Sequence, residues 1–162
     1  MASDLQFRRA GPRDRDAVLG LHRALYVTHR ETVLDAARAD FYAYRDLDAA
    51  LVEDVESLLA TDDGAVLLAE RDGRVVGYIT GRLVEDTRRV LPRRGIVEDW
   101  LVLPEERGRG TGRALMDLIA GVFREAGCTM IESATWPFND GARRAHEALG
   151  FLEYEIRYRR KL

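Results

Sequence analysis

The sequence predicts one α/β (α+β) domain built on a mixed, mostly antiparallel central sheet flanked by helices. A chain of 162 residues matches the usual length of a single domain, so we expect residues 1–162 to form one domain. Short runs with strand periodicity are separated by longer runs with helical periodicity. Two of the strand runs flank Asp72-Gly73, a dipeptide that favours the tight turn of an antiparallel hairpin.

The first half of the chain is predicted to contain one strand, two helices and a hairpin. Residues 5–9 alternate apolar and polar side chains as a strand does, and residues 11–27 have helical spacing. A second amphipathic helix is predicted over residues 47–59, and its outer face is acidic with little basic compensation. The runs AVLLAER and RVVGYITGRLV then form the two strands of the hairpin.

The second half is predicted to alternate strands and helices. The run GIVEDWLVL (95–103) is a strand, followed by a glycine-rich loop and a helix that begins near Arg113 and ends at Gly127. The run CTMIESATW (128–136) is a strand, and GARRAHEAL (141–149) is a short helix after Asn139. The last residues, FLEYEIRYRRKL (151–162), are predicted to form a closing strand or hairpin.

Composition and charge exclude several classes of protein. No apolar run approaches the roughly 20 residues that cross a bilayer, and the amino terminus lacks a secretory pattern, so we expect a cytoplasmic protein without membrane partners. A net charge of −3 gives no general attraction to nucleic acid. Cys128 is the only cysteine and fits a reducing compartment, and neither His22 nor His29 has a cluster of ligands nearby, so we expect no metal site. Both histidines are interpreted as structural or acceptor-pocket residues.

The segment LVLPEERGRGTG, residues 101–112, predicts an anion-binding loop. An apolar strand ends in Pro104, and arginines and three alternating glycines then lead into a helix. Free backbone N–H groups and the helix dipole favour a phosphate at such a helix start. A Walker loop is excluded because it needs Lys and then Ser or Thr after its last glycine. A dinucleotide fingerprint would need its third glycine at Arg113, and an ordinary glycine-rich turn is the remaining alternative.

The motifs of the second half resemble those of the GNAT superfamily of acetyl-CoA-dependent N-acetyltransferases. The superfamily signature R/Q-x-x-G-x-G/A is matched by Arg107, Gly110 and Gly112, after a strand that ends V-x-P at Val102 and Pro104. A later element, N-x-x-A followed by G-F, is matched by Asn139, Ala142, Gly150 and Phe151. The resemblance covers most of the chain and is weakest from about residue 26 to residue 62.

This resemblance implies a sheet with a splay between its fourth and fifth strands, and acetyl-CoA as the cosubstrate. It implies that loop amides hold the pyrophosphate and that the pantetheine arm pairs with the backbone of residues 101–103. The implied cofactor-binding residues are Leu101, Val102, Leu103, Arg107, Gly108, Arg109, Gly110, Thr111, Gly112, Arg113 and Asn139. For Asn139, a role as helix N-cap alone is the alternative.

Direct acetyl transfer requires a neutral amine, a stabilised oxyanion and a proton for the departing thiolate. Glu98 and Asp99 interrupt an otherwise apolar strand, and on an extended strand they point to opposite faces unless a bulge intervenes. We interpret Glu98 as the general base and Asp99 as a substrate-binding residue, and an ion pair with an arginine is the alternative for each. The Glu-Asp pair also loosely resembles diamine and polyamine acetyltransferases, which favours a cationic acceptor.

His146 occupies the position where the superfamily most often has the tyrosine that protonates the coenzyme thiolate. It lies on the apolar stripe of its predicted helix and therefore faces inward. We interpret it as the general acid, because imidazole titrates near neutral pH, and a core histidine is the alternative. Tyr154 and Tyr158 would be alternative donors if the closing strand passed the splay.

Together these patterns predict an N-acetyltransferase that transfers acetyl from acetyl-CoA to a primary amine. The expected acceptor is a small cationic molecule, similar to a polyamine or an aminoglycoside. The acidic helix either attracts that cation or is a solvated face. A non-catalytic acyl-CoA-binding module and an acetyltransferase for a protein amine are the alternatives. A homodimer is possible, because dimers are common in the superfamily and the final strand could supply a pairing edge.

Overall fold

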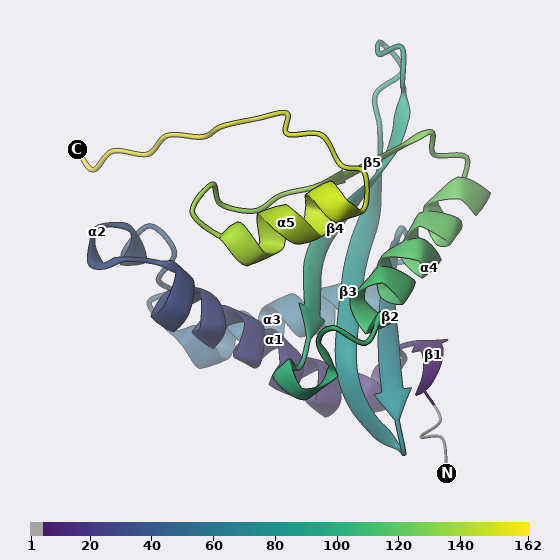
Figure 1. Cartoon of the computed structure of the whole chain (residues 1–162), viewed down its shortest axis with the longest axis horizontal. Helices are drawn as coiled ribbons and strands as arrows, with labels where there is room; N and C mark the ends of the chain where they lie inside the picture. The colour runs from purple at the N-terminus through teal and green to yellow at the C-terminus, as the bar shows by residue number, and fades with distance from the viewer. Residues whose placement is uncertain (1–4) are drawn as a thin grey trace.

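The computed structural model describes residues 5–162 and has a five-stranded sheet with helices on both faces (Figure 1). The strands are β1 (Leu5–Arg9), β2 (Gly64–Arg71), β3 (Arg74–Glu85), β4 (Arg93–Val102) and β5 (Met130–Ser133). The helices are α1 (Arg15–Thr28), α2 (Ala36–Ala39), α3 (Leu47–Ala60), α4 (Thr111–Glu125) and α5 (Asp140–Ala148). The predicted fold class is therefore confirmed.

The strands follow one another across the sheet in chain order, β1 to β5. The first four are antiparallel neighbours, and β5 is parallel to β4. Asp72 and Gly73 both have positive φ angles, 53° and 77°, as the predicted hairpin turn requires. The ladder between β4 and β5 ends at the pair Val97 and Ser133, whereas β4 continues to Val102. The predicted splay between the fourth and fifth strands is thus confirmed.

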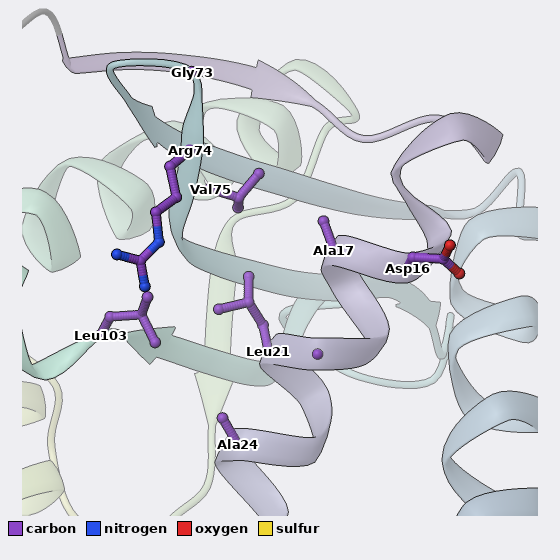
Figure 2. A pocket seen from close by; sticks show the side chains of 9 residues that line it. Asp16, Ala17, Leu21, Ala24, Gly73, Arg74, Val75 and Leu103 are labelled. Atoms are coloured by element: carbon purple, nitrogen blue, oxygen red, sulfur yellow. The ribbon is translucent and has the colours of Figure 1, made fainter.

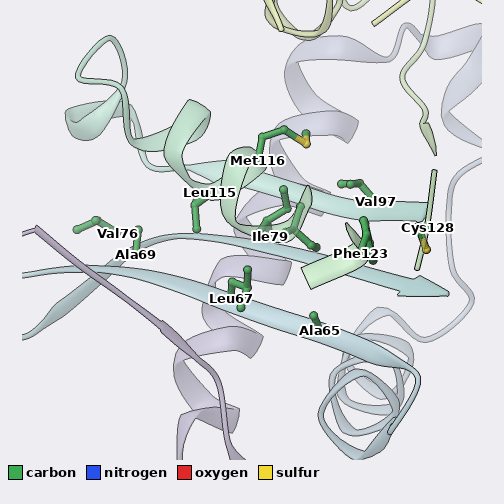
Figure 3. Close-up of a cluster of buried hydrophobic side chains, with 11 residues drawn as sticks. Ala65, Leu67, Ala69, Val76, Ile79, Val97, Leu115, Met116, Phe123 and Cys128 are labelled. Atoms are coloured by element: carbon green, nitrogen blue, oxygen red, sulfur yellow. The ribbon is translucent and has the colours of Figure 1, made fainter. Parts of the chain in front are cut away.

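Two apolar cores lie on opposite faces of the sheet. On one face, α4 packs Leu115, Met116 and Phe123 onto the strands (Figure 3). Phe123 comes so close that a Cβ atom added to Gly95 would lie 2.1 Å from its ring, so only glycine fits there. On the other face, α1 and α3 pack against β2, β3 and β4 through the buried residues Val18, Leu21, Leu25, Val55, Val66, Leu68, Tyr78 and Leu101.

Helix α1 is fixed at its start by a buried carboxylate. Asp14 accepts two hydrogen bonds from the Arg8 guanidinium, at 2.8 and 2.9 Å, and a third from the backbone N–H of Gly11 at 2.8 Å. These bonds hold the pKa of Asp14 at about 2, chiefly through Arg8. Because Arg8 belongs to β1, this cluster ties α1 to the edge of the sheet.

More of the acidic side chains on α3 have basic partners than the sequence suggested. Arg15 and Arg23 of α1 pair with Glu56 and Asp48 of α3, at 2.8 and 2.6 Å. The expectation of little basic compensation was wrong, because the partners are remote in sequence and meet only when α1 packs against α3. Asp46 caps α3 by accepting from the N–H of Ala49.

Two differences from the sequence prediction concern the second half of the chain. Strand β5 has four residues, Met130–Ser133, where a run of nine was predicted, because β4 diverges from it. The predicted closing strand over residues 151–162 is wrong for the single chain: this segment has no regular structure and no ladder partner within residues 5–162. A strand needs a neighbour for its backbone hydrogen bonds, and the segment runs away from the sheet (Figure 1).

Candidate active site

A β-bulge in β4 brings the two adjacent carboxylates to one face of the sheet. In the ladder with β3, Asp99 is opposite Thr80 and Val97 is opposite Gly81, so Glu98 is the extra residue. Glu98 then contacts Arg82, and Asp99 contacts Thr80. Because Thr80 and Arg82 are two residues apart on β3, both carboxylates lie on the face covered by α1 and α3.

Glu98 is held in an ion pair at the edge of this face. Its Oε1 atom accepts from Nε of Arg82 at 2.6 Å, and its side chain is 36% exposed. It lines a pocket of about 360 Å³ near the end of α3, together with Ser57, Thr61 and Asp63. Glu98 can therefore contribute negative charge there, but the guanidinium already occupies one of its oxygens.

Asp99 belongs to what we call the carboxylate cluster: Asp99, Thr80, His22, Tyr78 and Asp54. Its side chain is 16% exposed and accepts from the Thr80 hydroxyl at 3.1 Å, while the N–H of Asp99 donates back to that hydroxyl. Burial raises the pKa of Asp99 above its ordinary value, although the nearby His22 acts in the opposite direction. Asp99 is thus a buried carboxylate suited to accept a proton.

His22 connects Asp99 to a second, more exposed carboxylate. Its Nδ1 atom lies 3.0 Å from the Tyr78 hydroxyl and 3.6 Å from Oδ2 of Asp99. Its Nε2 atom lies 3.4 Å from Oδ2 of Asp54, whose side chain is 45% exposed. The cluster therefore extends from the buried end of the bulge to the surface of α3.

An aromatic cluster borders these carboxylates; it consists of Tyr26, His29, Tyr42, Tyr44, Trp136 and Phe138. Tyr26 stacks on Tyr42 at 4.8 Å between ring centroids, and Tyr42 meets Trp136 edge-on at 5.1 Å. Burial raises the pKa of Tyr42, with further contributions from Tyr44 and Asp99. The aromatic rings therefore lie near the carboxylates. This arrangement suits a ligand that is cationic and also has apolar faces.

The glycine-rich loop has the geometry of an anion site. Gly108 and Gly110 adopt positive φ angles of 74° and 85°, and Gly110 is the residue from which α4 begins. Within residues 5–162, no side chain caps the first N–H groups of this 15-residue helix. These groups and the helix dipole are therefore available to a phosphate.

Two buried polar atoms beside this loop also lack partners in the described part of the chain. They are Oγ1 of Thr111 and Nε1 of Trp100. Trp100 approaches α4 so closely that a Cβ atom on Gly112 would lie 3.3 Å from its ring. The loop, its free N–H groups and these two atoms fit a phosphate-bearing ligand.

The arginines of the loop mainly hold its surroundings in place. Arg107 donates to the carbonyl of Val102 at 3.1 Å, and Arg113 donates to the carbonyl of Ala148 at 3.0 Å. Arg109 is 59% exposed and lies 3.4 Å from the buried carboxylate of Glu106. Arg113 thus joins α4 to α5, and Arg109 is the most available of the three for a ligand phosphate.

His146 lies in α5 and forms hydrogen bonds through both ring nitrogens. Its Nδ1 atom is 2.7 Å from the Ala142 carbonyl, which can only accept, so Nδ1 carries the proton. Its Nε2 atom is 2.8 Å from the Ser133 hydroxyl, which donates to it when the ring is neutral. The ring also meets Trp100 and Phe151 edge-on. Since Ser133 is the last residue of β5 paired with β4, this hydrogen bond lies where the splay opens.

Asn139 is the N-cap of α5, which is one of the two roles that the sequence suggested for it. Its side-chain oxygen accepts from the N–H of Ala142 at 3.2 Å at the start of α5. Its amide nitrogen is not needed for that bond, so contact with a ligand stays a prediction.

A second pocket borders the end of the segment, residues 101–103, that is predicted to pair with the cofactor. It has a volume of about 500 Å³ and lies between α1 and the start of β3 (Figure 2). Ala17, Leu21 and Ala24 approach it from α1, and Val75 and Leu103 come from the other side. The lining is mainly apolar, with Arg74 and Asp16 at its borders, so we assign no chemistry to it.

Several residues of the site were not recognised from the sequence. Ser133 lies in a short strand without a motif, and Tyr42 and Trp136 are 94 positions apart in the chain. His22 was identified only as structural or as part of an acceptor pocket. The clustering of tyrosines at 42 and 44 was a usable signal, whereas the meeting of His22 with Asp99 required the bulge and the packing of α1.

Residues 5–162 show neither a metal-ligand cluster nor a membrane-spanning helix. They contain no group of three or more histidine, cysteine or acidic side chains arranged to hold a metal ion. None of their helices has both the length and the apolar character needed to cross a bilayer.

Comparisons of the sequence with known proteins give a consistent result. Residues 24–151 match the acetyltransferase (GNAT) family. The chain is 34% identical over 134 residues to an aminoglycoside N(6′)-acetyltransferase type 1 of Stenotrophomonas maltophilia, covering 76% of this chain and 88% of that protein. It is 37% identical over 76 residues to an L-2,4-diaminobutyric acid acetyltransferase of Nocardia farcinica, covering 47% and 37%.

Solved structures extend this similarity to the whole fold. The aminoglycoside N-acetyltransferase AAC(6′)-Iy in complex with CoA superposes with a TM-score of 0.79 at 25% identity, covering 100% of this chain and 98% of that one. The same enzyme with the bisubstrate analogue CoA-S-monomethyl-acetylneamine gives 0.77 at 25% identity, covering 99% and 100%. The family match covers well over half of the sequence, and the loop and the splay agree with it, so this chain is an acetyltransferase of the GNAT family.

Proposed function

We propose that the enzyme transfers acetyl from acetyl-CoA to a primary amine of a small polycationic acceptor of the aminoglycoside type. The observation that carries this proposal is that the carboxylate cluster, which includes Asp99 of β4, lies beside the aromatic cluster, and that β4 leads toward the glycine-rich loop. Relatives named as aminoglycoside N(6′)-acetyltransferases support the acceptor class. Bound acetyl-CoA would supply the acetyl thioester, and the loop around Gly110 would hold its pyrophosphate.

The acceptor side supplies negative charge and flat apolar surfaces. Asp54 is close enough to the surface to bind a second ammonium group while Asp99 faces the reacting amine. Tyr42, Tyr44 and Trp136 offer ring faces, and a cation above an aromatic ring gains about 0.5–2 kcal/mol. A polyamine could use the charges and the cation–π contacts as well, so the relatives named as aminoglycoside acetyltransferases are what favours an amino sugar.

Asp99 is the best candidate for the general base. An alkylamine arrives as an ammonium ion at neutral pH and must lose a proton before it attacks. The raised pKa of Asp99 makes its carboxylate a better proton acceptor than an exposed aspartate. Glu98, which the sequence suggested for this role, is ion-paired with Arg82, so we assign Glu98 to the charge of the acceptor side.

The general acid is proposed to be His146 acting through Ser133. A proton on Nε2 of His146 passes to Oγ of Ser133 along their 2.8 Å hydrogen bond, and the hydroxyl delivers its own proton toward the splay. The Ala142 carbonyl keeps Nδ1 protonated throughout, so the imidazole gives and regains its proton only at Nε2. Tyr154 and Tyr158, the alternative donors, are 92% and 90% exposed and do not line the splay.

The proposal is tested by measuring free thiol release with acetyl-CoA and a panel of amines. The decisive pair is two aminoglycosides that differ only in carrying an amino or a hydroxyl group at the 6′ position. We expect turnover with the amine and none with the hydroxyl compound. Spermidine, 2,4-diaminobutyrate and a lysine peptide complete the panel.

The other outcomes each exclude a part of the proposal. Preferred turnover of spermidine or of the peptide would overturn the acceptor class and leave acetyl transfer intact. Stabilisation against heat by CoA, without turnover of any amine, would favour the non-catalytic acyl-CoA-binding module. Absence of CoA stabilisation would contradict the role of the loop itself.

A further inference from the structure

Trp100 carries a buried polar atom that the rest of the described chain leaves unpaired. The residue belongs to β4, and its partly buried ring packs against the core under α4. The indole Nε1 atom has no hydrogen-bond partner within residues 5–162 and is buried from solvent. An indole N–H can only donate, and a buried donor without an acceptor is unfavourable. A ligand that supplies an acceptor to this N–H would therefore gain affinity.

Trp100 lies on the stretch of β4 where β5 no longer runs beside it. The ladder between β4 and β5 ends at the pair Val97 and Ser133. Trp100 comes three positions after Val97, which is about 10 Å further along an extended strand. On the other side of β4 it is still paired with Ile79 of β3. The ring therefore lies at the opening of the splay, on the face that α4 covers.

The same ring contacts both parts of the site that a bound coenzyme has to connect. Toward the glycine-rich loop, a Cβ atom on Gly112 would lie 3.3 Å from Cζ2 of Trp100 and 3.5 Å from its Nε1. Gly112 is the second residue of α4, where free N–H groups are available to a phosphate. Toward α5, the ring meets His146 edge-on, with 5.5 Å between ring centroids. Trp100 thus lies between the phosphate end of the proposed site and the thiol end.

We propose that Trp100 binds the pantetheine arm of acetyl-CoA and that its indole N–H donates to an amide carbonyl of that arm. The arm joins the phosphates to the thioester, so it crosses the interval that the Trp100 ring borders. Its amide carbonyls are acceptors, and its methylene groups suit the apolar face of an indole. A turn of the partly buried ring about its side-chain bonds brings the N–H to the arm. This inference rests on the acetyl-CoA cosubstrate of the proposed function.

Trp100 differs in kind from the other groups that we assign to the cofactor. The loop around Gly110 offers backbone N–H groups, and residues 101–103 are predicted to pair through their backbone. Trp100 adds a side chain that recognises the arm and not the nucleotide. A change at Trp100 should therefore weaken the binding of CoA and leave the binding of its nucleotide half, adenosine 3′,5′-bisphosphate, unaltered.

The first test compares these two ligands by calorimetric titration of Trp100→Phe, which keeps an aromatic ring and removes the N–H. We expect the affinity for CoA to fall about 5- to 10-fold, the loss of one hydrogen bond, while the affinity for adenosine 3′,5′-bisphosphate stays unchanged. Trp136→Phe is the matched control, because Trp136 is the other tryptophan and packs against Tyr42 of the aromatic cluster. It should bind CoA as tightly as the wild type.

The other outcomes separate this inference from the proposed function. Unchanged CoA affinity in Trp100→Phe would leave a buried water as the only partner of the N–H and would overturn the inference. An equal loss for both ligands would also overturn it, because Trp100 would then only support the loop. Both results leave the proposed function intact. A wild type that binds no CoA would instead contradict the loop, and with it both the proposed function and the inference.

The second test reads the hydrogen bond directly in a chain that keeps Trp100. In a nuclear magnetic resonance spectrum, the isotope-labelled chain of 18.3 kDa gives one indole N–H signal for each of its 2 tryptophans, and Trp136→Phe assigns them. CoA should move the Trp100 signal downfield, as a new hydrogen bond to a carbonyl does. Adenosine 3′,5′-bisphosphate should leave that signal nearly in place. A Trp100 signal that does not move at saturating CoA would exclude the contact.

Discussion

The two faces of β4 offer a ligand different kinds of chemical group. The face toward α1 and α3 carries charged and aromatic side chains, centred on Asp99 and Tyr42. The face toward α4 carries Trp100, close to the glycine-rich loop and to His146. One side therefore presents side chains assembled from several elements, and the other mainly presents backbone N–H groups at a helix start.

This difference explains why the glycine-rich loop could be predicted from the sequence and the side-chain clusters on the other face could not. A backbone site requires glycines at fixed spacing, so Gly108, Gly110 and Gly112 are visible as a motif. A side-chain site can be built from any elements that pack together. The carboxylate and aromatic clusters therefore left only scattered residues in the sequence.

The largest expected effect separates the two adjacent carboxylates of the acceptor side. Asp99→Asn should lower kcat/KM by about 100-fold or more, because removal of a general base costs about 10²–10⁴-fold. Glu98→Gln should change it by less than about threefold, since this carboxylate is ion-paired at the surface. Steady-state kinetics with a saturating cofactor measure both. The reverse ranking would return the role of base to Glu98.

The pH profile of the wild type adds a second check on the same carboxylate. Because burial raises the pKa of Asp99, activity should increase with pH through a limb that lies above the ordinary aspartate value of about 3.9. That limb should disappear in Asp99→Asn and persist in Glu98→Gln. Loss of the limb in Glu98→Gln alone would contradict the assignment.

The next effect concerns the hydrogen bond that lies at the opening of the splay. Ser133→Ala and His146→Phe should each lower kcat by about 10- to 100-fold, with KM for the acceptor nearly unchanged. If the two residues act as one donor, the double variant should be no worse than His146→Phe alone. Additive losses would show that the residues act separately.

The fold was more predictable than the site because its signals are local. The Asp72-Gly73 turn, the amphipathic helices and the apolar strands each depend on residues close in sequence. The pairing of α1 arginines with α3 acids and the bulge at Glu98 depend on packing between distant segments. Residues 151–162 have strand periodicity, but a single chain offers them no ladder partner, so periodicity alone predicted the wrong structure.

A smaller effect tests whether the glycine-rich loop binds CoA mainly through backbone N–H groups. Gly110→Ala should weaken CoA binding by about 5- to 30-fold, because a side chain in the left-handed region costs about 1–2 kcal/mol and the loop must regain that conformation to bind. Gly121→Ala in the same helix is the control, since a Cβ atom there meets nothing within 4 Å. Calorimetric titration with CoA measures both. Equal affinities for both variants would contradict a backbone site at Gly110.

The smallest expected effect tests whether acceptor binding can be weakened while CoA affinity stays unchanged. Asp14→Asn should lower the free energy of unfolding by about 1 kcal/mol, because the change removes a charge-assisted pair with Arg8 that is only partly shielded from solvent. The fold lowers the pKa of Asp14 to about 2, so its contribution is complete above about pH 4 and is lost as the pH falls toward 2. Urea unfolding of both proteins at pH 7 and near pH 2 measures this difference, which should be much smaller at the lower pH because the folded carboxyl is then about half protonated. Since Asp14 fixes the start of α1, which carries His22, KM for the acceptor should rise while CoA affinity stays unchanged. A parallel loss of CoA affinity would show that the two faces of β4 are coupled through the sheet.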